Sequence, residues 1–150
     1  MDTAVRRLFA TYERLTNEAL VGEADVAALS RCYSTEFIGA GPAGVRTGHN
    51  DAEYREVLAQ GFAGYRGIGT KSMTVDGIEV TGIDDRHCLA RVSWSAVYDR
   101  GEAPDVSIDF DVTYLVQLRD DDAVVFGWIA GDEQAALRDH GISWCPLGAF

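Results

Sequence analysis

The second half of the chain alternates apolar and polar residues over two long segments. In residues 88–98 the apolar face consists of Ala90, Val92, Trp94, Ala96 and Tyr98. In residues 105–118 the corresponding face consists of Ile108, Phe110, Val112, Tyr114, Val116 and Leu118. Alternate side chains of a β-strand point to opposite faces of its sheet. Both segments therefore predict strands with one buried face and one mostly polar face.

Short loops join these strands to their neighbours. The loops DRGEAP (99–104) and RDDDA (119–123) are rich in turn residues. Residues 70–82 predict a preceding strand with a bulge at Gly77, and residues 124–130 predict a following strand that is apolar on both faces. Because consecutive strands joined by short loops usually pair with one another, a mostly antiparallel sheet is expected.

The first third of the chain has the period of helices instead. Apolar residues recur at steps of three and four between residues 5 and 20, which is typical of an amphipathic helix. A shorter second helix is expected to begin near residues 23–25, with a stripe formed by Val26, Leu29 and Tyr33. Residues 34–48 predict a short strand followed by a loop rich in Gly and Pro.

A third helix is expected to begin at Asn50, whose side chain can cap it. Gly61 and Gly64 mark the region where this helix should fray or stop. Its apolar stripe comprises Tyr54, Val57, Leu58 and Phe62. At the other end of the chain, residues 132–140 predict a short helix that ends at Gly141.

This order of elements predicts an α+β fold in a single domain over residues 1–150, with a core over about residues 4–140 and a C-terminal tail over 141–150. Three N-terminal helices are expected to cover the inner face of a curved sheet. A twisted sheet wrapped on helices leaves a cone whose narrow end is filled and whose wide end can stay open.

Charge, hydropathy and motifs argue against several functions. The net charge of −11 disfavours nucleic-acid binding, because such binding depends on neutralising phosphates. No apolar run reaches the roughly 18 residues of a spanning helix, and no signal-peptide segment is evident, so a cytoplasmic protein without membrane contact is expected.

Cys32, Cys88 and Cys145 lack C-x-x-C spacing and are interpreted as buried thiols. No metal-ligand spacing, P-loop, nucleophile elbow or dinucleotide motif occurs, so neither a metal nor a cofactor is expected.

Three segments carry a family resemblance that covers about residues 4 to 140. They are RLFATYERLTNEALVGEADVAALSRCYSTEF, GVRTGHNDAEYREVL and DVTYLVQLRDDDAVVFGWIAGDE. The chain resembles the nuclear transport factor 2-like superfamily, and within it the small bacterial proteins called SnoaL-like or ketosteroid isomerase-like. The resemblance implies a cone-shaped, mixed and mostly antiparallel sheet wrapped on the helices, a ligand pocket between sheet and helices, and a homodimer formed through the sheet.

The resemblance also implies a mechanism to compare with these residues. Ketosteroid isomerases remove a proton next to a carbonyl with a carboxylate on the first strand, while a Tyr and a protonated carboxyl stabilise the oxyanion. Tyr12 lies where the Tyr would be. The first strand offers only Ala40 or Gly41 where the base should stand, and Tyr114 falls at the second carboxyl. Proton abstraction by that route is therefore not expected.

Epoxide hydrolases of the same fold use an Asp-Arg-Asp set around an attacking water. Arg91, Asp109 and Asp111 could imitate this set only if their face of the sheet were the inner one. That orientation would expose large aromatic residues such as Trp94 and Phe110, which usually dominate core energetics. The polar face is therefore predicted to be solvated or dimer-facing, with Arg91 paired with an Asp.

The histidines offer weaker candidates. His49 lies in a loop beside Asn50 and Asp51, where it could act as a base, although most loop histidines are only solvated. His87 begins a strand, and His140 lies in the last turn of a helix, where the helix dipole favours a cation. Structural roles are predicted for both.

The remaining functional signal is aromatic. The rings expected to face the interior belong to Tyr12, Tyr54, Trp94, Tyr98, Phe110 and Tyr114. Together they suit either a fully packed core or a mostly apolar pocket with a few polar groups that orient a ligand.

Two functional hypotheses follow. The leading one is a protein that binds a small apolar, polycyclic or carbonyl-bearing molecule, with Tyr12 and Tyr114 as hydrogen-bond donors; its enzymatic version is a cofactor-independent isomerase, cyclase or hydratase. The catalytic residues of that version are unknown. The alternative is a non-catalytic homodimerisation or interaction module with a vestigial pocket.

Overall fold

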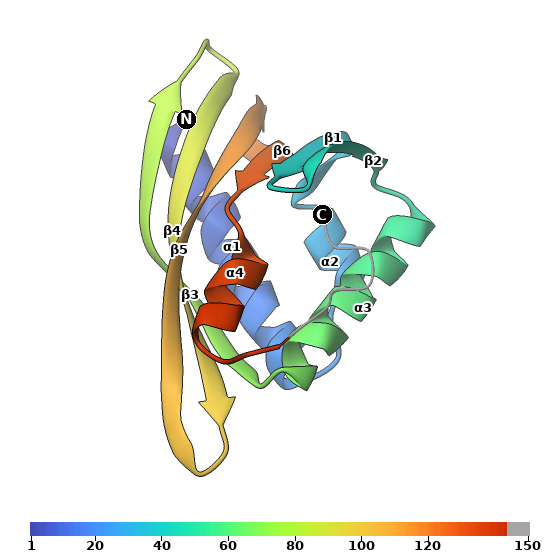
Figure 1. Ribbon diagram of the computed structural model, residues 1–150. Helices are drawn as coiled ribbons and strands as arrows, with labels where there is room; N and C mark the ends of the chain where they lie inside the picture. Colours follow the sequence, from blue (N-terminus) through green and yellow to red (C-terminus); the bar gives the residue numbers. More distant parts are fainter. Residues whose placement is uncertain (144–150) are drawn as a thin grey trace.

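The structure is a computed structural model, and it describes residues 1–143. It places helices before a long run of strands (Figure 1). The elements are α1 (Asp2–Val21), α2 (Val26–Ser30), β1 (Tyr33–Gly41), β2 (Gly44–His49), α3 (Ala52–Gly67), β3 (Thr70–Gly82), β4 (His87–Arg100), β5 (Ala103–Arg119), β6 (Asp122–Ala130) and α4 (Glu133–Asp139).

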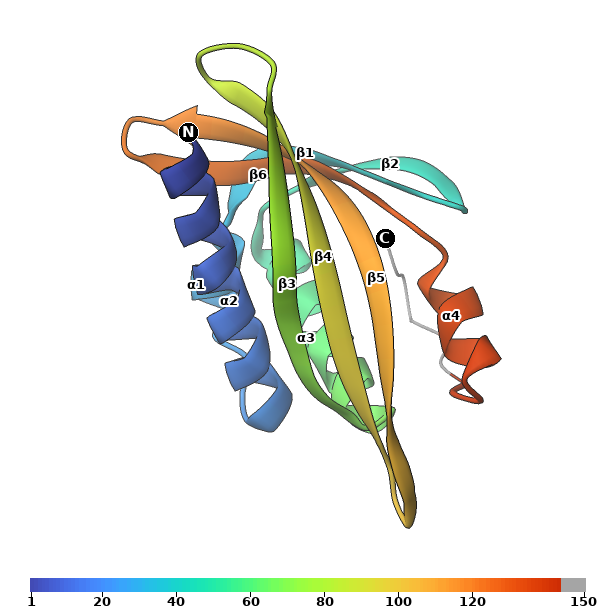
Figure 2. The same cartoon turned by 90° about the vertical axis from the view of Figure 1, so that its left-hand side faces the viewer.

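The strands form one curved, six-stranded sheet in the order β2-β1-β6-β5-β4-β3. All neighbouring strands are antiparallel except β1 and β6, which are parallel. Helix α1 packs against β3 and β6 and also contacts α3. The long strands β3 to β5 run along one side of the molecule, and β1, β2 and α3 lie on the other side (Figure 1). Figure 2 shows how these long strands curve. The expected α+β architecture of a mixed sheet on three N-terminal helices is confirmed.

The two alternating segments form the centre of the sheet, and their faces are oriented as predicted. Val92 and Ala96 on β4 are fully buried, and their partners Val112 and Ile108 on β5 are nearly so. The opposite face is mostly polar, and on it Arg91 makes an ion pair with Asp111, as expected. Gly77 marks an irregularity in the pairing of β3 with β4, which confirms the predicted bulge.

The prediction of a loop after the first strand was wrong. Residues 44–49 form β2, which pairs with β1 through a tight turn in which Gly44 has a φ of +117°. β2 lies at the edge of the sheet, and none of its residues is fully buried. An edge strand without a buried face has no apolar alternation, so the period-two signal was absent.

Two details of the helices also differ from expectation. α2 ends at Ser30, so Tyr33 begins β1 and does not extend the stripe of the second helix. Asp51, not Asn50, caps α3, because its side chain accepts a hydrogen bond of 3.0 Å from the backbone N–H of Tyr54. α3 then continues through Gly61 and Gly64 to Gly67. Tertiary packing offsets the low helix propensity of glycine here.

The thiols of Cys32 and Cys88 are buried and free, as predicted. Cys145 lies outside the described residues. Within residues 1–143, no helix combines the length and the apolar character needed to cross a bilayer.

Candidate functional site

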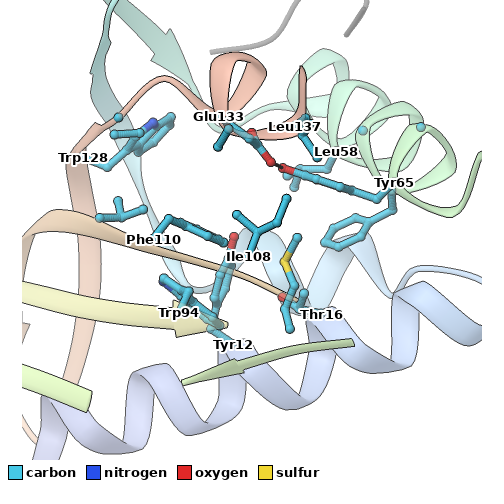
Figure 3. A pocket seen from close by; sticks show the side chains of 18 of the residues that line it. Tyr12, Thr16, Leu58, Tyr65, Trp94, Ile108, Phe110, Trp128, Glu133 and Leu137 are labelled. Atoms are coloured by element: carbon cyan, nitrogen blue, oxygen red, sulfur yellow. Dashed lines mark hydrogen bonds between the residues drawn. The ribbon is translucent and has the colours of Figure 1, made fainter. Parts of the chain in front are cut away.

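A cavity of about 610 Å³ lies between the concave face of the sheet and helices α1, α3 and α4 (Figure 3). Its walls are mainly aromatic and aliphatic, with a few hydroxyl and carboxyl groups. Sites for small organic molecules in proteins typically enclose about 300 to 1,000 Å³ and have this composition. The cavity is therefore the candidate functional site.

All six aromatic residues singled out from the sequence line this cavity. They are Tyr12 on α1, Tyr54 on α3, Trp94 and Tyr98 on β4, and Phe110 and Tyr114 on β5. Tyr98 is almost completely buried, so it mainly forms the wall, whereas Tyr12 and Phe110 keep part of their surface accessible. That these residues contact a ligand stays a prediction.

A pair of tyrosines supplies one polar point of the cavity. The hydroxyl of Tyr33 on β1 donates a hydrogen bond of 3.0 Å to the hydroxyl of Tyr12. Because Tyr12 accepts this bond, its own O–H hydrogen stays available as a donor. Burial raises the pKa of both phenols, so both are neutral at physiological pH. Figure 3 shows the Tyr12 hydroxyl pointing into the hollow beside Phe110 and Ile108.

Tyr33 is held in place from the loop before α3. The side-chain amide of Asn50 donates to the backbone carbonyls of Ser30, at 2.6 Å, and of Tyr33, at 3.2 Å. Asn50 thus fastens the end of α2 to the start of β1, although it does not cap α3 as expected. This fastening fixes the strand position from which Tyr33 reaches Tyr12.

A half-buried carboxyl group supplies the second polar point. Tyr65 on α3 donates a hydrogen bond of 2.8 Å to Glu133 in the first turn of α4, and the two side chains point toward one another (Figure 3). Burial raises the pKa of the Glu133 carboxyl, and the hydrogen bond from Tyr65 partly offsets this rise. The Asp132 side chain caps α4 by accepting from the N–H of Ala135 at 2.8 Å, which fixes where the helix begins.

The cavity is also lined by four residues that were not predicted from the sequence: Glu133, Tyr65, Tyr33 and Trp128. One signal could have found Glu133. In a helix starting at residue 133, Ala136 and Leu137 lie three and four residues farther on and share its face. A glutamate on the apolar face of a helix that follows the last strand is a candidate for a buried carboxyl.

Two further polar groups of the lining are buried without hydrogen-bond partners in the described part of the chain. They are the Thr16 hydroxyl and the Trp94 indole N–H. Burial raises the pKa of the neighbouring Tyr114 phenol, and the Trp94 indole partly offsets this rise without forming a hydrogen bond to it. Unsatisfied buried polar groups are uncommon, and beside a cavity they are available to an acceptor on a ligand.

No carboxyl group lies at the two first-strand positions predicted for an isomerase base. Ala40 on β1 pairs with Ile129, which is 55% exposed on the outer side of the sheet. Gly39 faces Trp128, and a Cβ added to Gly39 would lie 2.9 Å from the Trp128 ring. The indole of Trp128 thus covers the inner side of this strand.

The other candidates lie away from the cavity. His49 is highly exposed, 3.9 Å from Glu36. His87 contacts the carboxylate of Asp84 at 2.9 Å at the start of β4, and the ring of His140 lies 2.8 Å from the Ala136 carbonyl at the end of α4. None of these histidines lines the cavity.

Comparison with known proteins places the fold. A family model described as "NTF2-like protein (DUF6841)" matches residues 2–133, and no curated protein is a significant match. An NTF2-like protein with a cystatin-like fold from Novosphingobium aromaticivorans shares 15% identity at a TM-score of 0.67, over 92% of this chain and 86% of that chain.

Two other solved structures are similar. An NTF-2 like protein of unknown function from Shewanella oneidensis shares 17% identity at a TM-score of 0.64, over 88% of this chain and 100% of that chain. A ketosteroid isomerase-like protein from Erwinia carotovora atroseptica shares 13% identity at a TM-score of 0.59, over 86% of this chain and 93% of that chain. These likenesses show the fold, and the family match spans most of the sequence. The chain belongs to the NTF2-like proteins, in the family DUF6841.

Proposed function

We propose that this protein binds a small apolar molecule in the cavity and orients it by a hydrogen bond from Tyr12 to an oxygen of the ligand. The observation that carries the proposal is the Tyr33-to-Tyr12 hydrogen bond at the wall of a cavity of about 610 Å³. A neutral phenol that already accepts one hydrogen bond is a good donor to a carbonyl or hydroxyl oxygen. The ligand is therefore a polycyclic or carbonyl-bearing compound.

The aromatic walls support the choice of an apolar ligand. Phe110 and Tyr12 are only partly buried, so a ligand that covers them removes apolar surface from water. Such burial contributes roughly 25 cal/mol per Å². Flat ring systems also make favourable edge and offset contacts with aromatic side chains.

The experiment is a thermal-shift screen of ketones, polyketides and sterols on the wild-type protein. Hits are then repeated on Tyr12→Phe, which removes the donor, and on Ala136→Trp, which fills the cavity from α4. The proposal expects hits that stabilise the wild type, stabilise Tyr12→Phe less, and fail on Ala136→Trp. Hits whose stabilisation is the same in all three proteins would show that they bind elsewhere.

A second candidate function is catalysis without a cofactor, as an isomerase, cyclase or hydratase. The observation that favours it is the Glu133 carboxyl, whose raised pKa brings it nearer to neutrality, where a group can both accept and donate protons. Several phenols in the same cavity feel its charge, among them Tyr12 and Tyr114. Solvent-deuterium incorporation into a bound ketone, lost in Glu133→Gln, would support this candidate.

We also propose that the outer face of the sheet forms a homodimer. Val45, Ala40 and Ile129 lie side by side across β2, β1 and β6, and Val45 and Ile129 are 66% and 55% exposed. Ile38, also exposed, lies two residues before Ala40 on the same face. A contiguous exposed apolar patch on a sheet favours association. This surface exists independently of the cavity, so it also fits a non-catalytic dimerisation module.

A further inference from the structure

We propose that the Glu133 end of the cavity binds an organic cation, so that the ligand is a protonated amine with an apolar, ring-containing body. This inference rests on the proposed function and adds the sign of the ligand's charge. It follows from the charges of the lining, from the burial of Glu133 and from the aromatic walls around it.

The lining is acidic and contains no counter-charge. Its two carboxyl groups belong to Asp132 and Glu133, and no Lys, Arg or His among the described residues lines the cavity. An anionic ligand such as a fatty acid would therefore meet two carboxylates without a compensating charge, which disfavours it.

In the described part of the protein, Glu133 has fewer hydrogen-bond partners than a carboxylate can accept. It accepts one hydrogen bond, from Tyr65, and takes part in no ion pair. An ionised carboxylate can accept about four hydrogen bonds, and burying one without a partner charge is costly. The raised pKa of its carboxyl reflects this cost. A cation placed beside Glu133 would remove it.

The walls suit an organic cation better than a metal ion. Metal sites need several converging ligands, and no such group of three exists among residues 1–143. Aromatic faces attract organic cations through their quadrupoles, and cages of aromatic rings with a carboxylate suit ammonium groups. Tyr98 on β4 and Tyr65 on α3 both lie within electrostatic reach of the Glu133 carboxylate.

The test compares three ligands with the same ring body and different charge. Anthracenylmethylamine is cationic, anthracenylmethanol is neutral, and anthracenecarboxylate is anionic at neutral pH. Each is titrated into the wild-type protein by isothermal calorimetry. Because a hydrogen bond to a charged group is stronger than one between neutral groups, the amine is expected to bind at least about tenfold more tightly than the alcohol, and the carboxylate most weakly.

Two matched variants locate the effect. Glu133→Gln and Asp132→Asn each remove one negative charge from the start of α4, and Asn keeps the capping ability of Asp132. The proposal expects Glu133→Gln to reduce amine affinity at least about tenfold and to leave alcohol affinity nearly unchanged. Asp132→Asn should change amine affinity by less than about threefold, because its carboxylate is exposed to water.

The outcomes separate this inference from the proposed function. If the alcohol binds as tightly as the amine, or Glu133→Gln leaves their ratio unchanged, the cation site is wrong while the apolar pocket stands. Tighter binding of a neutral ketone than of the amine would likewise overturn it and indicate a protonated Glu133 that donates to a carbonyl. If no member of a wider panel of ring compounds binds, the proposed function itself fails. Circular dichroism of both variants confirms that they fold.

Discussion

The hydroxyl of Tyr65 on α3 lies 2.8 Å from the carboxylate of Glu133 on α4, and this hydrogen bond joins two helices that do not follow one another in the chain. It places a carboxyl group in a cavity whose other walls are mainly aromatic and aliphatic. Shielding this carboxylate from water costs free energy in the protein without ligand, and a suitable ligand can offset that cost.

The first prediction concerns the stability of Glu133→Gln without ligand. The pKa of Glu133 is raised on folding, so the protonated form is favoured more in the folded than in the unfolded state. Its contribution to stability is therefore fully present below the unfolded pKa of about 4.3 and is lost as pH rises through the folded pKa. Gln mimics the protonated form. We expect Glu133→Gln to raise the Tm at pH 7 and to leave it nearly unchanged near pH 4.

The other titratable groups that face Glu133 do not obscure this pH dependence. They are the phenols of Tyr65, Tyr98, Tyr12 and Tyr114 and the neighbouring carboxylate of Asp132. Burial raises the pKa of each of these phenols, so none titrates between pH 4 and 8. Asp132→Asn, which removes the neighbouring carboxylate, is the matched control. Thermal melts across this range that show Glu133→Gln less stable than wild type at pH 7 would contradict the burial argument.

The second prediction concerns Thr16. Its hydroxyl is buried beside the cavity without a hydrogen-bond partner in the described residues. Valine has nearly the same shape and helix propensity but buries no polar atom. We expect Thr16→Val to stabilise the empty protein by about 1 kcal/mol, or about 2–4 °C in Tm. A loss of stability in calorimetric melts would mean that the hydroxyl is satisfied in solution.

The third prediction uses two glycines with opposite surroundings. A Cβ at Gly48 on β2 would lie 2.4 Å from the buried ring of Phe37, whereas a Cβ at Gly61 in α3 would meet no atom within 4 Å. We expect Gly48→Ala to destabilise by about 1–3 kcal/mol through overpacking. Gly61→Ala should stabilise by about 0.5–1 kcal/mol by raising helix propensity. Chemical denaturation measures both, and equal effects would contradict the packing described here.

The fourth prediction tests the proposed dimer. Ile129→Asp places a charge in the apolar row on the outer face of the sheet, and Val21→Asp places one at the exposed end of α1. In sedimentation experiments at several concentrations, we expect a wild-type dimer that Ile129→Asp converts to a monomer and Val21→Asp leaves intact. A wild-type protein that stays monomeric at all concentrations would remove the outer-face proposal.

Much of the sheet could be predicted because its central strands bury only one face. The alternation around Trp94 and Tyr114 identified both strands and the side that faces inward. β2 was missed because an edge strand with no buried residue leaves no apolar pattern. Tyr33 was assigned to a helix because three- and four-residue spacing continues by chance across the end of α2.

The aromatic lining could be predicted, but the polar points of the cavity could not. Tyr12 and Tyr33 come from α1 and β1, and Tyr65 and Glu133 from α3 and α4, so only tertiary packing brings each pair together. Periodicity identifies which face of an element is buried. It gives no information about which buried polar group meets which.

Calorimetric titration of a polycyclic ketone, anthrone, into three proteins tests whether the cavity is the binding site. We predict saturable binding to the wild type, binding weakened several-fold to about tenfold in Tyr12→Phe, which loses one neutral hydrogen bond, and no binding to Ala136→Trp. Equal affinity for the wild type and Ala136→Trp would place the ligand outside the cavity and contradict the proposed binding site.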